Sequence, residues 1–193
     1  ASGARSQAVA PKQQAWLRAK QGEPGRCLRP DSLGAGCDSS TQHGPMHMTH
    51  AHTLRAAERG DAAEIAALAE EAELFPADML EPMMAPYFSG SADDRWCVAV
   101  DSFGAVVGFG FCELERLTEG TWNLLAIGVR GSQRGTGVGR QLMEYVEQDL
   151  RAVGGRLLIV ETLGTAAFAG THRFYVQTGY VEEARIRDFY EPG

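Results

Sequence analysis

The chain has 193 residues, of which 44% are hydrophobic and 22% are charged, and this suits one globular domain with an ordinary core. Its formal net charge of −7 disfavours nonspecific nucleic-acid binding and is compatible with a cationic or amine substrate. No apolar run approaches the length of a membrane span, so we expect neither nucleic acid nor a membrane among its partners.

The four cysteines are Cys27, Cys37, Cys97 and Cys112, and none of them forms a C-x-x-C pair with another. Metal or redox chemistry that depends on such a pair is therefore not predicted. We interpret all four as reduced thiols in a cytoplasmic protein.

Residues 1–50 are poor in large apolar side chains and rich in Ala, Gly, Ser, Pro and Gln. This composition predicts a disordered or non-native extension, with the native domain starting near Met48 and the folded part spanning residues 51–193. Four histidines lie close together at this boundary: His43, His47, His50 and His52. A spacer rich in histidine is the favoured interpretation, and we predict no metal.

The first patterned segments are a strand over Thr53–Ala57 and an amphipathic helix over Ala62–Glu73. Asp61 is expected to cap this helix, with Glu64 completing a capping box. The next stretch, Leu74–Ser89, is apolar and rich in methionine, so it either packs in the core or lines an acceptor pocket. Its three prolines, at positions 76, 82 and 86, are expected to break any long helix into short pieces.

Two apolar runs, Arg95–Asp101 and Ala105–Leu114, are separated by a short turn and predict an antiparallel hairpin. Gly108 and Gly110 inside the second run indicate a bulge or the close approach of a neighbouring element. A further apolar run, Asn123–Val129, predicts a buried central strand.

A turn with alternating glycines (Gly135, Gly137 and Gly139) follows the central strand and leads into a helix over Gln141–Val153. The next strand, Arg156–Val160, should run parallel to the central strand because a helix connects the two. These neighbouring strands are then expected to diverge around one ligand.

The glycine turn predicts an anion site, because backbone N–H groups at a helix start attract phosphate. Its spacing does not fit two common phosphate loops. The last glycine of the G-x-G-x-x-G dinucleotide motif is replaced by Leu142, and the lysine of the P-loop is absent. An oxidoreductase that binds a dinucleotide is therefore a minor alternative.

The segment Arg134–Gly139, with the sequence RGTGVG, resembles the R/Q-x-x-G-x-G/A pyrophosphate loop of the GCN5-related N-acetyltransferase (GNAT) family. A second segment, Phe174–Tyr180, is similar to the family's F-Y-x-x-x-G-F/Y signature and follows at the expected distance. The resemblance implies an α/β (α+β) GNAT fold. In that fold a mixed, mostly antiparallel sheet has a central parallel strand pair splayed around acetyl-coenzyme A, with helices on both faces.

If the resemblance holds, the cofactor is acetyl-coenzyme A as co-substrate. The backbone of Ile127, Gly128 and Val129 would pair with its pantetheine arm. The pyrophosphate would be held by the following loop: Arg134, Gly135, Thr136, Gly137, Val138, Gly139 and Arg140. Tyr175 would protonate the departing thiolate.

The resemblance also implies a general base, which many members carry as a glutamate at the position of Asn123. Asparagine cannot accept the proton of the amine, so the base must lie elsewhere. We prefer Glu161 at the end of the parallel strand, because strand ends beside a splayed gap face the cleft. The alternatives are Glu113, Glu115 and His172.

Two further departures concern Phe168 and the C-terminus. Phe168 stands where many members have a cofactor-binding asparagine. The chain stops at Gly193, after an expected strand over Tyr180–Tyr190, where the family would add a last strand. We therefore expect this strand to be missing, the domain to be C-terminally truncated, and the sheet to have unpaired edges there.

The expected function is transfer of an acetyl group from acetyl-coenzyme A to a primary amine of a small molecule or peptide, by direct attack in a ternary complex. The alternative is a catalytically impaired module that binds coenzyme A, which Asn123, Phe168 and the missing strand favour. The acceptor cannot be identified from the sequence, and a homodimer is one assembly that we consider.

Overall fold

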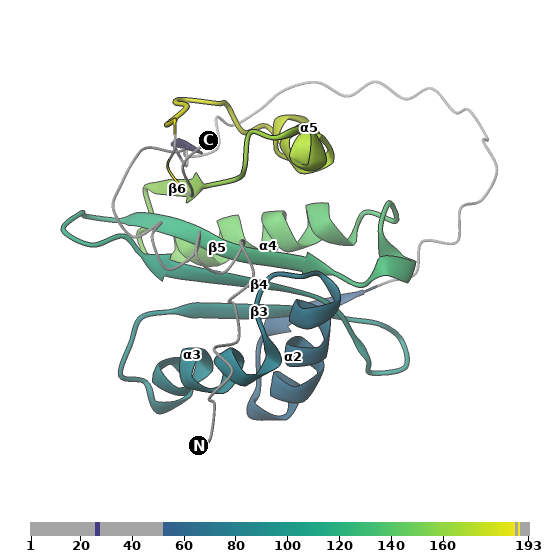
Figure 1. The fold of residues 1–193 in the computed structure, drawn as a ribbon. Helices are drawn as coiled ribbons and strands as arrows, with labels where there is room; N and C mark the ends of the chain where they lie inside the picture. Colours follow the sequence, from purple (N-terminus) through teal and green to yellow (C-terminus); the bar gives the residue numbers. More distant parts are fainter. Residues whose placement is uncertain (1–25, 28–51, 188, 190–193) are drawn as a thin grey trace, which may run out of the picture.

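The computed structural model describes residues 26–27, 52–187 and 189, and these residues form one sheet flanked by helices (Figure 1). The six strands lie in the order β1-β6-β5-β4-β3-β2. β5 and β6 run parallel, and every other neighbouring pair runs antiparallel. The strands are β1 (Arg26–Cys27), β2 (Thr53–Ala56), β3 (Arg95–Val100), β4 (Val106–Leu114), β5 (Thr121–Val129) and β6 (Leu157–Val160).

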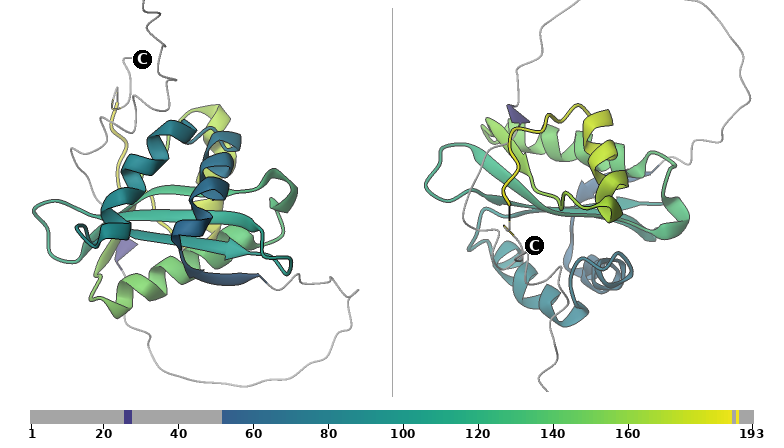
Figure 2. Two further views of the ribbon diagram at one scale, coloured as in Figure 1. Left: turned by 90° about the horizontal axis from the view of Figure 1, so that it is seen from below. Right: turned by 45° about the horizontal axis from the view of Figure 1, so that its top comes forward.

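Helices cover both faces of the sheet (Figures 1 and 2). α2 (Ala62–Glu71) and α3 (Ala77–Ser89) lie on one face, and α4 (Val138–Ala152) and α5 (Ala169–Gln177) lie on the other. Short 3-10 turns precede α2, α4 and α5: η2 (Arg59–Asp61), η3 (Gly131–Gln133) and η4 (Ala166–Phe168). The predicted fold class, with a mostly antiparallel sheet, one central parallel pair and helices on both faces, is confirmed.

Each face of the sheet has its own hydrophobic core, as the alternation of side chains along a strand requires. On the α4 side, Leu142 and Leu150 pack against the strands. On the α2 and α3 side, Ile65 and Leu68 pack against a stack of aromatic rings, in which the centroids of Trp96 and Phe111 lie 4.0 Å apart. These two cores hold the central strands in place from above and below.

The prediction that prolines break the segment before β3 is wrong, because α3 is one continuous helix that contains Pro82 and Pro86. Each proline removes one helical hydrogen bond, at a cost of about 3 kcal/mol in a helix interior. Burial of Leu80 and Met84 on the opposite side offsets this cost. Tertiary packing therefore decides the conformation here.

The predicted capping box at the start of α2 is also wrong. The carboxylate of Asp61 accepts hydrogen bonds from Arg55 Nη1 (2.6 Å) and Nη2 (2.8 Å) and from the Glu58 N–H group (2.7 Å). The hydrogen bonds from Arg55 keep the pKa of Asp61 below its ordinary value. Glu64 reaches across to β4, where it accepts a hydrogen bond from the Val106 N–H group at 2.9 Å.

The end of the described chain differs from the prediction in two ways. Residues 180–187 form no strand, although a strand over Tyr180–Tyr190 is expected from the resemblance. Tyr180 instead donates a hydrogen bond to buried Glu147 of α4, at 3.0 Å. The outer edge of β6 is paired at Leu157 and Leu158, which align with β1.

Gly108 and Gly110 allow the close approach of neighbouring elements. A Cβ atom at Gly108 would lie 2.9 Å from Leu142 Cδ1, and one at Gly110 would lie 3.0 Å from Cys97 Sγ. Cys97 and Cys112 are free thiols, and burial raises the pKa of Cys97 to about 12. Cys37, His43, His47 and His50 lie outside the described residues, as do the side chain of Cys27 and most of the predicted extension 1–50.

Candidate active site

The parallel strands β5 and β6 separate as predicted. Their pairing begins at Thr121 with Leu157 and ends at Leu124 with Val160. β5 then continues to Val129 beside β4 alone. A register shift between Phe111 and Cys112 of β4 lies at the same level and bends the strand pair there. A gap therefore opens between β5 and the chain that follows β6.

Backbone groups of β5 face this gap at alternate residues. The N–H group of Arg130 donates to Val107 O on β4 at 2.9 Å. Hydrogen-bonding direction alternates along an antiparallel strand, so Ile127 and Val129 direct their backbone groups toward the gap and Gly128 faces β4. Gly128 has a packing role, since a Cβ atom there would lie 2.6 Å from the ring of Phe109.

The glycine loop after β5 exposes a row of unpaired N–H groups. Gly135 and Gly137 have φ values of +80° and +97°, which side chains rarely adopt. Within the described residues, five N–H groups of the loop and the first turn of α4 donate to no backbone acceptor: those of Gly135, Gly137, Val138, Gly139 and Arg140. A helix start with unpaired donors attracts anions, and a diphosphate therefore fits this loop.

The side chains of the loop differ in their exposure and in their contacts. Arg134 and Arg140 are exposed, and Arg134 Nε donates to Val129 O at 3.3 Å. Thr136 Oγ1 donates to Gln133 O at 2.7 Å, so its hydroxyl braces the turn. Val138 is buried in the core on the α4 side.

Gly139 connects the two predicted motifs. A Cβ atom at this position would lie 3.2 Å from Cε2 of Phe174 in α5. The missing side chain therefore lets α4 and α5 pack closely, in addition to leaving its N–H group accessible. This contact brings the glycine loop and the Phe174–Tyr175 pair into one region of the molecule.

We predict that Gly137→Ala weakens acetyl-coenzyme A binding about 10- to 100-fold. This is the effect expected when one or two hydrogen bonds from the loop N–H groups to the charged diphosphate are misplaced. The Cβ atom meets open space, but the φ of +97° penalises it, so the loop must shift. Gly154→Ala is the matched control, because Gly154 has φ +80° in open space at the other end of α4. Calorimetry should show unchanged affinity for the control, and equal affinities of the two variants would contradict the prediction.

Tyr175 lies on α5, on the same side of the sheet as α4. Its ring packs against Phe174 (centroids 5.3 Å apart) and edge-on against Tyr180 (5.8 Å). Burial is the main reason that the pKa of the Tyr175 hydroxyl is raised well above its ordinary value, and nearby Cys112 adds to the effect. The hydroxyl therefore keeps its proton at neutral pH and is a potential proton donor.

Glu161 directly follows β6, at the point where the strands separate, and it is partly exposed. Its Oε1 atom accepts a hydrogen bond from Asn123 Nδ2 at 3.1 Å. Asn123 is only 4% exposed, and its Oδ1 atom is buried without a hydrogen-bond partner among the described residues. Sequence reasoning treats Asn123 only as a lost base and misses this contact, which depends on the register of β5 against β6.

The other base candidates are placed differently. Glu113 of β4 lies opposite Asn123 in the sheet and is partly exposed. Glu115 lies beyond the end of β4, and its Oε1 accepts a hydrogen bond from the Arg116 N–H group at 3.2 Å. His172 Nε2 is exposed and lies within hydrogen-bonding distance of Glu182 Oε2, at 3.0 Å. The structure thus brings Glu113 and Glu161 to Asn123, and leaves His172 on the surface.

Tyr175 and Glu161 lie on opposite faces of the sheet. Trp122 and Leu124 belong to the core on the α4 side, so Asn123 between them points to the α2 and α3 side. Glu161 contacts Asn123 and shares this side, whereas Tyr175 packs with the core on the α4 side. A carboxylate and a phenol hydroxyl therefore belong to different faces of the sheet.

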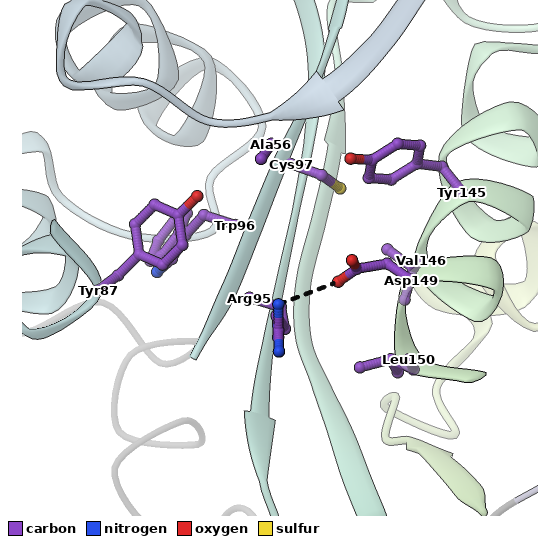
Figure 3. A pocket seen from close by; sticks show the side chains of 9 residues that line it. All are labelled: Ala56, Tyr87, Arg95, Trp96, Cys97, Tyr145, Val146, Asp149 and Leu150. Atoms are coloured by element: carbon purple, nitrogen blue, oxygen red, sulfur yellow. Dashed lines mark ion pairs between the residues drawn. The ribbon is translucent and has the colours of Figure 1, made fainter. Parts of the chain in front are cut away.

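A separate cavity of about 40 Å³ lies between β3, α3 and α4, and contains none of the predicted site residues (Figure 3). Arg95 and Asp149 form an ion pair across it at 3.8 Å. Its small volume suits ordered water rather than a substrate. No group of His, Cys, Asp and Glu side chains within residues 52–187 is arranged to hold a metal ion, and no helix there is both long and apolar enough to cross a membrane.

Comparisons with known proteins agree with this geometry. Residues 92–182 match the family described as the acetyltransferase (GNAT) domain. A protein from Desulfovibrio desulfuricans assigned to the GNAT family of acetyltransferases is 29% identical, with a TM-score of 0.67 over 74% of this chain and 93% of its own. No curated protein matches the chain.

Two more distant structures share the fold. A GNAT acetyltransferase from Brucella melitensis, solved with acetyl-coenzyme A, is 19% identical, with a TM-score of 0.52 over 70% of this chain and 90% of its own. An aminoglycoside 6'-N-acetyltransferase from Acinetobacter baumannii is 13% identical, with a TM-score of 0.61 over 70% of this chain and 95% of its own.

The family match and the shared fold define an acyltransferase. The chain carries a GNAT acetyltransferase domain, and the predicted family is confirmed.

Proposed function

We propose that this protein transfers the acetyl group of acetyl-coenzyme A to a primary amine of a small molecule or peptide. The observation that carries the proposal is the gap between β5 and β6, with unpaired loop N–H groups after β5, Glu161 on one face of the sheet and Tyr175 on the other. Loop donors, with Arg134 and Arg140 beside them, would hold the diphosphate. The backbone groups of Ile127 and Val129 would pair with the pantetheine arm as a neighbouring strand does.

In the proposed reaction both substrates are bound together, and the protein mainly positions them. Glu161 takes one proton from the ammonium group, and the nitrogen lone pair forms the C–N bond with the thioester carbonyl carbon. As the C–S bond breaks, Tyr175 donates its proton to the sulfur, and the second proton lost by the nitrogen returns to Tyr175 through solvent. The Val129 N–H group would stabilise the thioester oxygen.

Two observations favour a second candidate, a coenzyme A binding module with impaired catalysis. Asn123 replaces the glutamate that many family members carry, and Phe168 replaces a cofactor-binding asparagine. Phe168 ends η4 at the start of α5, on the chain that follows the gap. The loop donors would still bind the diphosphate in such a module.

One experiment on the full chain separates these functions. We expect acetyl-coenzyme A at 100 times its Kd to stabilise the protein by about 2.7 kcal/mol in thermal unfolding, and NAD to have no effect. Release of thiol is then measured with an aminoglycoside, a polyamine and a lysine-containing peptide. Binding without thiol release supports the impaired module, and stabilisation by NAD alone contradicts both candidates.

A further inference from the structure

The Asn123–Glu161 pair accounts for how this chain replaces the missing glutamate of β5. Asn123 is buried one residue before the pairing of β5 with β6 ends, and its partner Ile159 precedes Glu161 by two residues. Residues two apart on a strand share a face, so the two side chains meet. The hydrogen bond from Nδ2 to Glu161 Oε1 fixes the carboxylate at the mouth of the gap.

The orientation of the Asn123 amide follows from its partner. A carboxylate only accepts hydrogen bonds, so the NH₂ group must face Glu161 and the oxygen must face away. That oxygen is buried, and no described residue donates to it. Buried polar atoms nearly always have a partner, and an exception in a native protein marks a catalytic role, local strain or a bound water or ion.

The geometry points to Asn123 as a positioning residue that acts through Glu161, an inference that rests on the proposed function. Its Nδ2 atom holds the Glu161 carboxylate in one orientation, so that Glu161 meets the amine from a fixed place when it takes the proton. Because Asn123 is buried and Glu161 is partly exposed, the amine contacts Glu161 and not Asn123.

Glu113, aligned with Asn123 on β4, adds negative charge to the same face. Its carboxylate favours a cationic acceptor over a neutral one. β4, β5 and the residue that follows β6 thus present two carboxylates and one amide on the face of the sheet opposite Tyr175. A neutral hydroxyl acceptor would gain nothing from this charge.

The test uses the amine that the wild-type protein acetylates fastest in the panel above. Asn123→Leu, which keeps a similar volume without polar atoms, should lower kcat/KM for the amine roughly 10- to 100-fold and leave the Kd of acetyl-coenzyme A unchanged. The acidic limb of the pH profile should move up by about one pH unit, because a hydrogen bond to the charged form lowers a carboxyl pKa and its loss raises it. The amine itself titrates in the same way in every assay. A difference between the pH profiles of two variants must therefore come from the protein.

Two further variants control for folding. Asn123→Asp keeps the shape and places a second carboxylate beside Glu161, so it should move the acidic limb further upward. Thr121→Val removes a buried polar group from the same strand and face without touching Glu161, and should leave the limb in place. Unshifted limbs in both Asn123 variants would overturn the inference, even if activity falls. If the wild-type protein acetylates no amine, the proposed function fails and the inference fails with it.

Discussion

Replacing Tyr175 with phenylalanine is expected to lower kcat roughly 10²- to 10⁴-fold, the usual contribution of a positioned general acid. Acetyl-coenzyme A affinity should be unchanged, because the hydroxyl acts on the sulfur only as the C–S bond breaks. Among the described residues no hydrogen bond engages the Tyr175 hydroxyl, and its pKa is raised by burial. Stopped-flow or steady-state thiol release, with calorimetry for affinity, measures the two quantities separately.

The raised pKa of Tyr175 also predicts how kcat depends on pH. Because the pKa of Tyr175 is raised above the ordinary 10.0, the hydroxyl stays protonated from neutrality up to at least that value. Tyr175 should therefore produce no alkaline decline in kcat over this range. Tyr180→Phe is the matched control, since Tyr180 packs against the Tyr175 ring but donates to Glu147. Loss of turnover in the control, or full turnover in Tyr175→Phe, would remove the acid role.

Replacing Glu161 with glutamine is expected to lower kcat/KM for the amine at neutral pH by roughly 10²- to 10⁴-fold. Glutamine has nearly the same shape, and its carbonyl oxygen can still accept the hydrogen bond from Asn123. The variant therefore removes the proton acceptor and keeps the geometry. The deficit should shrink as the pH rises, because more of the amine is then already deprotonated.

Glu113→Gln separates Glu161 from the nearest alternative base. Both carboxylates lie on the same face of the sheet, on either side of Asn123. If Glu161 is the base, Glu113→Gln should raise KM for the amine through lost charge attraction and change kcat little. If instead Glu113→Gln removes the acidic limb of the pH profile and Glu161→Gln preserves it, the roles of the two residues must be exchanged.

Two structural features of the candidate site were predictable because their signals are local. The loop from Arg134 to Gly139 combines glycine spacing with a following helix, and the positive φ values of Gly135 and Gly137 are a property of the turn itself. The parallel arrangement of β5 and β6 follows from the intervening α4. The roles proposed for Ile127, Val129 and Tyr175 depend on the family resemblance, and they remain predictions until tested.

Other features were not predictable because they depend on contacts with residues from other elements of the fold. Asp61 has the sequence of a helix cap, but the Arg55 guanidinium offers a bidentate partner that a single residue pattern does not reveal. Pro82 and Pro86 would break an isolated helix, but the burial of Leu80 and Met84 holds α3 together. The expected strand is absent from residues 180–187, where the Tyr180 hydroxyl donates instead to Glu147 of α4.

The amino-acid sequence by itself determined the order of the elements, the glycine loop before α4 and the class of enzyme, since each rests on residues close together in the chain. Only the tertiary structure decided what Asn123 contacts. Its register against Ile159 places its amide beside Glu161, which lies 38 residues further along the chain. That contact depends on the pairing of two strands and the point where they part, which no local pattern encodes.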